Sequence, residues 1–260
     1  MEPSAFQQFA ALEDRHWWFI GRRRLYPELL AAVLERDLGR PPEGLRVVDV
    51  GCGVGGFLAP LERFGSVLGL ELDQESVSWC RQRGFPRTAA ASSAALPLAD
   101  GSQDLLCLWD VLEHTPDDVA TLREARRCLR PGGHVALSVP AYPWLYANND
   151  RVARHYRRYT RRTLRERVAT AGLELRKATY VNVLLAPAIV PAVLLIKLKE
   201  RLSARTDDPT TNLTWPLPRP AHQLLAALFA SERHALSRID APFGHSLLAV
   251  ARRPPDGPGA

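Results

Sequence analysis

Short apolar runs alternate with longer amphipathic stretches along the first part of the chain. Brief runs rich in Val, Ile and Leu are typical of buried strands, whereas apolar positions three or four residues apart are typical of helices. The expected strands are 45–50, 66–71, 86–90, 103–109 and 134–139, and the expected helices between them are 56–64, about 73–83 and 117–129. This alternation predicts an α/β fold with a mostly parallel sheet.

Composition changes mark the expected domain boundaries. Residues 1–40 are expected to form a helical N-terminal cap, ahead of a main domain over 41–253. Within that domain, residues 141–170 are a basic segment on the acceptor side, and residues 181–240 are an apolar, helical insertion before the last strand. Residues 254–260 are expected to be a disordered tail.

The C-terminal part carries one long uncharged run. A strand is expected over 173–180, and residues 178–196 have no charged side chain but contain prolines. Their length approaches a membrane span, yet the prolines would leave backbone groups unpaired in lipid, so a buried or interfacial helix is expected. A loop over 204–220, a helix over 221–239 and a strand over 244–251 follow.

Overall composition fits one large domain. The chain has 260 residues, a hydrophobic fraction of 46% and a net charge of +6, supplied mainly by arginine. The scattered cysteines Cys52, Cys80, Cys107 and Cys128 lack metal-binding spacing and are expected to be buried free thiols of a cytosolic protein. The N-terminus lacks the pattern of a signal peptide. We therefore expect a cytoplasmic protein and predict no metal site.

The strand at 45–50 runs into a glycine-rich turn. Gly51, Gly53 and Gly56 have the spacing of a strand-to-helix turn that lets backbone approach a ligand closely. Asp49 gives this strand an acidic end, which favours a ligand with a cationic amino group over a pyrophosphate. Glu71 ends the next strand, where an acid can accept hydrogen bonds from ribose hydroxyls. An ordinary dinucleotide fold with two incidental acids is the alternative.

These acids belong to a larger group of polar side chains at strand ends. Trp109, Asp110 and His114 follow the strand at 103–109. Ligands of open α/β sheets bind outside the carboxyl ends of the strands, where all of these residues are expected. Their convergence on one edge predicts a single active site.

Five motifs in register over residues 47–134 carry a family resemblance. They are VVDVGCG, GLELD, LPLADGSQDL, DVLEH and LRPGGH. In this order they resemble the class I S-adenosylmethionine-dependent methyltransferases, and more narrowly their type 11 group, which includes small-molecule and quinone methyltransferases. The resemblance implies a Rossmann-like fold with a seven-stranded sheet whose last strand is antiparallel. It also implies S-adenosyl-L-methionine as cofactor and S-adenosyl-L-homocysteine as product.

The resemblance further implies which residues hold the cofactor. The turn at Gly51 and Gly53 would face the methionine portion, Glu71 would hold the ribose hydroxyls, and residues 92–93 would border the adenine. The implied set is Asp49, Gly51, Cys52, Gly53, Gly56, Glu71, Leu72, Ser92, Ser93, Trp109, Asp110 and His114. Ser92 departs from the family pattern, which usually has an aspartate there to accept a hydrogen bond from the adenine amino group.

An aromatic cluster precedes the first strand. Trp17 and Trp18 lie close to arginines, including Arg23, an arrangement that suits a lid over a planar or anionic ligand. The alternative is that these aromatic side chains dock the N-terminal helix on the core.

A second candidate for substrate contact is the basic segment. Arg157 and Arg158 lie in a run of arginines, whose forked side chains suit a carboxylate or phosphate. His155 and Tyr159 would share a face if this segment is helical. The alternative is a solvated surface with structural ion pairs.

The hypothesised reaction is in-line displacement, for which the sulfonium is already activated and no metal is required. The protein would hold the acceptor in line and exclude water. An oxygen acceptor would need a base, for which the candidates are His114, His155, Tyr142 and Asp110. His114 is the first choice because it follows the fourth strand, and a structural role is its alternative.

Three function classes stay open. The motifs favour a methyltransferase acting on a small molecule, and an anionic or lipid-like acceptor is one hypothesis because the apolar segment 181–199 suits peripheral membrane contact. The net charge suggests a nucleic-acid methyltransferase, but no added RNA-binding module or Asn/Asp-Pro-Pro-Tyr/Phe element is found, so no nucleic-acid partner is expected. A non-catalytic S-adenosylmethionine-binding protein is the third class.

Overall fold

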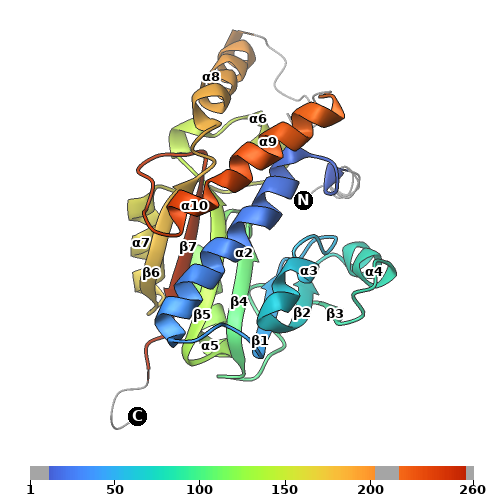
Figure 1. Ribbon diagram of the computed structural model, residues 1–260, viewed down its shortest axis with the longest axis vertical. Helices are drawn as coiled ribbons and strands as arrows, with labels where there is room; N and C mark the ends of the chain where they lie inside the picture. The colour runs from blue at the N-terminus through green and yellow to red at the C-terminus, as the bar shows by residue number, and fades with distance from the viewer. Residues whose placement is uncertain (1–11, 203–216, 256–260) are drawn as a thin grey trace.

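The computed structural model describes residues 12–202 and 217–255, and within them a seven-stranded sheet runs through the centre (Figure 1). Its order is β3-β2-β1-β4-β5-β7-β6. The strands are β1 Leu45–Val50, β2 Gly65–Glu71, β3 Thr88–Ala90, β4 Gln103–Trp109, β5 Leu129–Pro140, β6 Glu174–Val181 and β7 Ser246–Arg252. Strand β7 is antiparallel to β5 and β6, and the pairs among β1 to β5 are parallel. The predicted fold is confirmed.

Helices connect and cover these strands. The α-helices are α2 Trp17–Leu38, α3 Leu58–Leu61, α4 Gln74–Gln82, α5 Asp118–Cys128, α6 Asn148–Val152, α7 Arg161–Thr170, α8 Ala186–Leu202, α9 Arg219–Ser231 and α10 Arg233–Leu236. The 3-10 helices are η1 Glu62–Phe64, η2 Leu112–His114 and η3 Pro143–Leu145. Asp73 and Asp117 cap α4 and α5, because each carboxylate accepts a hydrogen bond from the backbone N–H of the third residue after it.

The core forms where α2 lies across one face of the sheet. Leu25, Leu29 and Leu30 of α2 are fully buried with the apolar side chains of β1, β4 and β5. Figure 1 shows α2 in front of the sheet, with α9 crossing beside its N-terminal half. Apolar side chains of α2 are therefore part of the core packing. The four cysteines are buried free thiols, as predicted.

Several boundaries differ from the sequence expectations. Helix α2 starts at Trp17 and continues through Pro27, so Trp17 and Trp18 are its first two residues. Strand β5 begins at Leu129 because that residue already pairs with Gln103 of β4 across a register shift. The helix expected over 221–239 is divided into α9 and α10. The expectations for residues 1–11, 204–216 and 256–260 lie outside the described residues.

The apolar run after β6 forms α8, which Figure 1 shows extending beyond the end of the sheet. Pro191 lies inside this helix. Across the described ranges, no helix is both long and apolar enough to cross a membrane.

Candidate functional site

The turn after β1 is shaped by glycines in the left-handed region. Gly51 has φ 71° and Gly53 has φ 56°, conformations that side chains rarely adopt. A Cβ on Gly51 would also lie 2.7 Å from the Val111 side chain. The backbone N–H groups of Gly51 and Cys52 both donate to the carbonyl of Leu70, at 2.7 and 3.1 Å. These bonds hold the turn against the end of β2.

Two carboxylates flank this turn in different ways. Glu71, at the end of β2, accepts from the backbone N–H of Gly53 at 2.8 Å and of Leu72 at 2.7 Å. Asp49 is 1% exposed, and its Oδ1 is buried without a hydrogen-bond partner. Burial is the main reason that the pKa of Asp49 lies well above its usual range, with smaller contributions from Cys80, Glu71 and Glu13. The carboxylates beside the turn therefore favour a cation.

Glu13 brings a third carboxylate to the turn from the segment before α2. A Cβ on Gly56 would lie 2.0 Å from Glu13 Oε1, so the carboxylate rests directly on this glycine. Arg83, after α4, holds Glu13 Oε2 at 2.6 Å and also donates to the carbonyl of Val54 at 3.0 Å. Burial raises the pKa of Glu13 although the Arg83 hydrogen bond lowers it. The Glu13–Arg83 pair thus joins both sides of the glycine turn.

The predicted adenine-side residues lie where β2 and β3 end. Leu72 follows Glu71 and is 71% exposed, which leaves an apolar surface beside the carboxylate. The backbone N–H of Ala91 donates to the carbonyl of Glu71 at 2.9 Å, so Ser92 and Ser93 come directly after a segment paired with β2. The hydroxyl of Ser92 accepts from the N–H of Ala94 at 3.2 Å. These residues share one edge with the glycine turn.

Trp109, at the end of β4, is part of an aromatic stack. Its ring lies 5.2 Å from Phe57 and 5.3 Å from Tyr26, centroid to centroid. Its indole nitrogen is buried without a hydrogen-bond partner. The guanidinium of Arg22 lies over the rings of Tyr26 and Phe57, at 5.1 and 5.6 Å. The stack therefore joins α2, the start of α3 and the end of β4.

Arg22 connects α2 to the end of β4 through an ion pair in which the arginine is buried and Asp110 is partly exposed. It is 5% exposed and lies 2.6 Å from Asp110 Oδ2. The Ser138 hydroxyl donates to Asp110 Oδ1 at 2.8 Å and accepts from Arg22 at 3.3 Å. Asp110 has φ 55°, so the chain turns sharply where β4 ends. This network fixes the Asp110 carboxylate.

Trp17 and Trp18 pack mainly against α9. The Trp18 ring stacks on Phe229 with centroids 5.5 Å apart, and Trp17 meets the same ring edge-on at 6.3 Å. Trp18 also lies edge-on to His245, with centroids 5.8 Å apart. Arg23 points elsewhere, donating to the carbonyl of Glu13 at 2.7 Å. The contacts support the docking alternative, and the lid over a ligand stays a prediction.

His114 and His155 come together after β4. Their rings lie 4.6 Å apart and nearly perpendicular, and His155 Nδ1 is 2.8 Å from Asp150 Oδ1. Burial lowers the pKa of His114 to about 4, with His155 adding to the effect. His114 is therefore neutral at pH 7 and can accept a proton. Residues 155–158 form no helix, so the condition under which His155 and Tyr159 would share a helical face is not met.

Arg157 and Arg158 of the basic segment are engaged in ion pairs. Arg158 lies 2.8 Å from the buried Asp150, and Arg157 lies 3.1 Å from Asp118. Tyr159 is 2% exposed, and its hydroxyl donates to Asp118 at 2.9 Å. These contacts support the structural alternative for the segment, and its role as an anion clamp stays a prediction.

Tyr142 lies on the same side as the basic segment. Its ring stacks on Tyr180 at 5.2 Å, centroid to centroid, and on Trp144 at 5.4 Å. Burial raises the pKa of its phenol. A phenol with a raised pKa stays protonated at pH 7, so Tyr142 suits hydrogen-bond donation better than proton removal.

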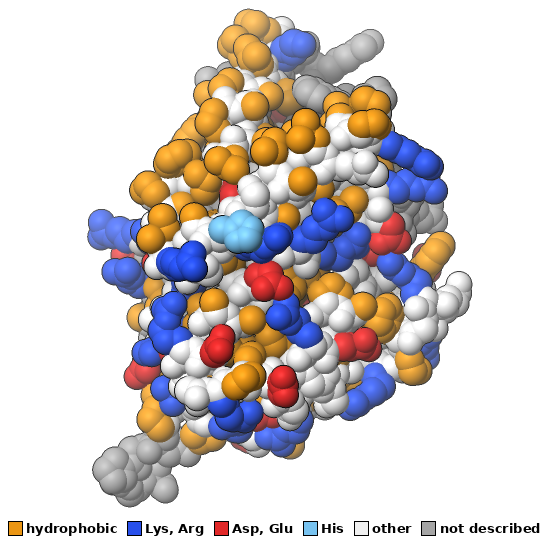
Figure 2. Space-filling view, viewed as in Figure 1, with side chains coloured by type: hydrophobic (Ala, Val, Ile, Leu, Met, Phe, Trp, Pro, Cys, Tyr) orange, Lys and Arg blue, Asp and Glu red, His pale blue; other side chains and the backbone are white. Residues whose placement is uncertain are grey.

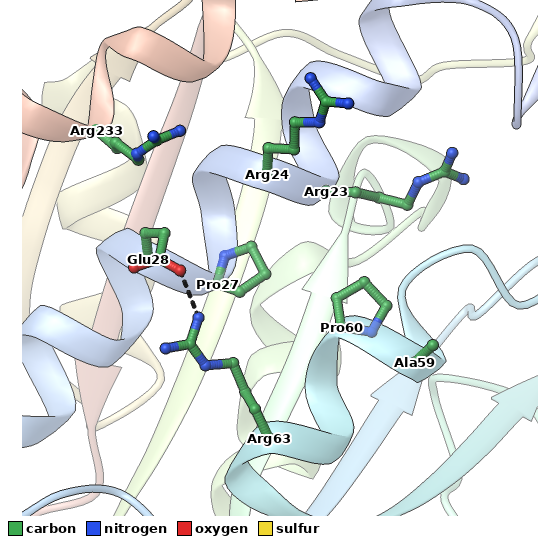
Figure 3. Close-up of a pocket in the computed structure, with 8 residues that line it drawn as sticks. All are labelled: Arg23, Arg24, Pro27, Glu28, Ala59, Pro60, Arg63 and Arg233. Atoms are coloured by element: carbon green, nitrogen blue, oxygen red, sulfur yellow. Dashed lines mark hydrogen bonds and ion pairs between the residues drawn. The ribbon is translucent and has the colours of Figure 1, made fainter. Parts of the chain in front are cut away.

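A surface hollow of about 750 Å³ lies apart from these residues, between α2, the start of α3 and α10 (Figure 3). Arginines of α2, η1 and α10 line it together with Ala59 and Pro60 of α3, and the close-up shows Arg63 bonded to Glu28 beneath Arg24. Of the predicted site residues it includes Arg23. The hollow is distinct from the strand ends that hold Asp49 and Glu71.

Sequence reasoning did not select Glu13, Arg22, Glu113 or Asp150. One signal was available for Arg22, because it lies four residues from both Trp18 and Tyr26 and so shares their buried helical face. The other three are acids whose importance depends on contacts across the fold, and their local sequence carries no such signal.

Comparison with known proteins places this geometry in a family. A family model described as a methyltransferase domain matches residues 21–178, which is more than half of the chain. The chain is 34% identical over 147 residues to a ubiquinone biosynthesis O-methyltransferase of Xanthomonas oryzae pv. oryzae, an alignment covering 52% of this chain and 60% of the relative. The chain thus spans about 60% of the length of this curated relative.

Solved structures share the fold. A chain from the complex between the Haloferax volcanii Trm112 methyltransferase activator and a methyltransferase superposes with a TM-score of 0.58 at 20% identity, covering 98% of this chain and 96% of that one. The Haemonchus contortus phosphoethanolamine N-methyltransferase 2, solved with S-adenosylhomocysteine, gives a TM-score of 0.52 at 18% identity, covering 86% and 52%. The chain belongs to the class I S-adenosylmethionine-dependent methyltransferase family.

Proposed function

We propose that the protein transfers the methyl group of S-adenosylmethionine to a small-molecule acceptor. The observation that carries the proposal is the buried Asp49 carboxylate, whose Oδ1 has no partner beside a glycine turn. An unpaired buried acid is costly unless a ligand satisfies it. S-adenosylmethionine brings both an ammonium and a sulfonium, so its charge suits a pocket flanked by Asp49, Glu71 and Glu13.

Each side chain then has a defined task. Asp49 would face the ammonium, and Glu71, already anchored by backbone N–H groups, has lone pairs left for ribose hydroxyls. Leu72 and Ser92 would border the adenine, and the Trp109 stack would form the wall toward the acceptor. When bound, the cofactor supplies a methyl group that is already activated on sulfur. The protein positions the acceptor and excludes water.

The acceptor side suits an oxygen that must lose a proton. His114 is neutral at pH 7 because burial lowers its pKa to about 4, so its ring can accept the proton of a hydroxyl. The relative from Xanthomonas oryzae is named an O-methyltransferase of ubiquinone biosynthesis, which supports a small-molecule acceptor with a hydroxyl group. A tyrosine with a raised pKa, Tyr142, would donate a hydrogen bond.

We further propose a lipid-like acceptor or a membrane surface as the setting. Figure 2 shows hydrophobic side chains gathered at the upper end of the molecule, over α8 and α9. The large exposed side chains in and near these helices are Leu184, Leu194, Leu195, Leu198, Leu202, Leu217, Leu224 and Leu228. Lys197 and Lys199 of α8 add positive charge, a combination that favours interfacial binding to anionic lipid.

The cofactor is tested by thermal stabilisation with S-adenosylhomocysteine, with NAD and NADP run beside it. A ligand at a hundred times its Kd adds about 2.7 kcal/mol to the free energy of unfolding. We expect a shift with S-adenosylhomocysteine alone, lost in Asp49→Asn and Glu71→Ala and kept in the control Glu43→Gln, an exposed acid before β1. A shift with the dinucleotides instead would contradict the proposal.

The acceptor is tested by S-adenosylhomocysteine release with paired phenols that share one ring and differ in a polyprenyl tail. We expect the tailed compound in anionic vesicles to be the better acceptor, and Leu198→Glu to reduce both turnover there and vesicle co-sedimentation. Trp79→Gln, which changes an exposed aromatic side chain on α4, is the control. Equal turnover of both phenols with no vesicle binding would leave a water-soluble acceptor and reject the lipid-like one.

A further inference from the structure

Three potential metal ligands meet on the acceptor side of the strand ends. Glu113 and His114 come from η2, and His155 comes from the segment after α6. One ligand atom from each lies within 4.8 Å of the others. This spacing was invisible in the sequence, because His155 is far from the other two along the chain.

Glu113 is the least explained member of this group. It is 1% exposed, and its Oε2 is buried without a hydrogen-bond partner. Burial and the nearby Asp110 carboxylate both disfavour its charged form, so its pKa lies well above its usual range. A buried carboxylate oxygen with no partner costs stability unless a proton or a cation satisfies it.

Both histidines are oriented by a bond from one ring nitrogen. His155 Nδ1 lies 2.8 Å from Asp150 Oδ1, which leaves its Nε2 for a ligand. A ring nitrogen of His114 bonds to the backbone carbonyl of Ala153. Histidines that bind metals almost always direct their other ring nitrogen to a carboxylate or carbonyl, as both do here.

The support behind His155 is itself rigid. Asp150 is fully buried and accepts from Arg158 and from the backbone N–H of Ala147, each at 2.8 Å. The backbone N–H of Tyr156 donates to the carbonyl of Glu113 at 2.7 Å. The two segments that carry the three side chains are therefore tied together next to the cluster.

We propose that Glu113, His114 and His155 bind one divalent transition-metal ion, with zinc-like chemistry. Two imidazole nitrogens and one carboxylate oxygen suit zinc, cobalt or nickel better than magnesium, which prefers oxygen ligands. Ligand atoms around one such ion lie roughly 3–4 Å apart, given bonds of about 2.0–2.2 Å. The side chains need to close by about 1 Å to reach that geometry. The proposal departs from the sequence expectation of no metal and does not depend on methyl transfer. It assigns to the metal the same His114 nitrogen that would otherwise accept a proton, so the two roles exclude each other.

The probe is Co²⁺ alone, added to metal-stripped, tag-free protein without cofactor or acceptor. We expect equilibrium dialysis to give one bound ion per chain. The bound Co²⁺ should show visible absorption bands typical of nitrogen and oxygen ligands. His155→Ala and Glu113→Gln should each remove the bands, and Asp150→Asn should weaken binding by about 10–100-fold. His234→Ala, which changes an exposed histidine on α10, should change nothing.

The variants distinguish cobalt bound at the proposed site from cobalt bound elsewhere on the protein. Bands that survive in His155→Ala, or that His234→Ala also removes, would reject the site, as would binding of less than half an ion per chain to folded protein. Circular dichroism shows whether each variant is folded. Failure of this proposal leaves S-adenosylhomocysteine binding intact, so it can be told apart from failure of the proposed function.

Discussion

The edge of the sheet at the carboxyl ends of the parallel strands has two halves that are built differently. The cofactor half lies at the ends of β1, β2 and β3, and the acceptor half lies after β4. At the ends of β1, β2 and β3, backbone geometry dominates: Gly51 and Gly53 shape a turn, and Glu71 is held by N–H groups close to it. After β4, side chains from distant segments dominate, as in the pairs Arg22–Asp110 and His155–Asp150. In the proposed function, the first half holds the cofactor and the second half faces the acceptor.

The two halves also differ in charge. The glycine turn gathers acids and leaves Asp49 Oδ1 without a partner, whereas after β4 Asp110 and Asp150 each pair with an arginine or histidine, and Glu113 is the exception. Asp150 shows the result, because His155 and Arg158 outweigh the effect of burial and lower its pKa to about 2. An unpaired charge requires a ligand, and a paired charge stabilises the fold.

The largest expected effect is a loss of stability on breaking the ion pair between Arg22 and Asp110, which joins α2 to the acceptor half. Arg22→Ala leaves Asp110 without its partner and removes cation–π contact with Tyr26. Removing one partner of a buried ion pair typically costs about 3–5 kcal/mol. We expect the free energy of unfolding in urea to fall by this amount, whereas Arg36→Ala on the exposed part of the same helix should change it by about 0.5 kcal/mol or less.

A double variant sharpens this test. Arg22→Met with Asp110→Asn removes both charges and should recover part of the lost stability, because no buried charge is then unpaired. If Arg22→Ala and Arg36→Ala cost the same, the buried pair does not connect the two regions energetically.

The same contrast explains how far the sequence could predict the molecule. Strand β4 and the turn after β1 were predicted at their boundaries, since short apolar runs and glycine spacing are local signals. Arg22 was missed in favour of Arg23, because only the helical phase of Trp18 and Tyr26 distinguishes the two. Glu113 was read as part of a motif and not as a site residue, because its unpaired oxygen depends on burial by segments far along the chain.

The second largest expected effect is a pH dependence of S-adenosylhomocysteine binding, and it arises in the cofactor half alone. The pKa of Asp49 is raised in the free protein, mainly by burial. A bound ammonium favours the ionised carboxylate, so binding should release a proton and weaken as pH falls. The limit for one linked proton is about tenfold in Kd per pH unit. Calorimetric titration with S-adenosylhomocysteine in buffers of different ionisation enthalpy measures both quantities.

Asp49→Asn provides the contrast for this titration. It should flatten the pH profile and weaken binding, yet raise the melting temperature of the free protein, because an amide avoids the cost of burying or protonating a carboxylate. Glu43→Gln should keep the slope. A slope that persists in Asp49→Asn would assign the proton to another group at the turn, such as Glu13.

The smallest effect concerns Glu13, which extends the cofactor half to the N-terminal segment. Arg83 holds Glu13 against Gly56, but the pair is partly exposed, with 28% and 13% of the two side chains accessible. Such a pair contributes about 0.2–1 kcal/mol. We expect Arg83→Ala to speed S-adenosylhomocysteine dissociation by a few-fold in stopped-flow measurements, and Arg87→Ala, at an exposed arginine before β3, to leave the rate unchanged. An unchanged dissociation rate in Arg83→Ala would contradict this prediction. The glycine turn would then hold S-adenosylhomocysteine without any side chain from the segment before α2.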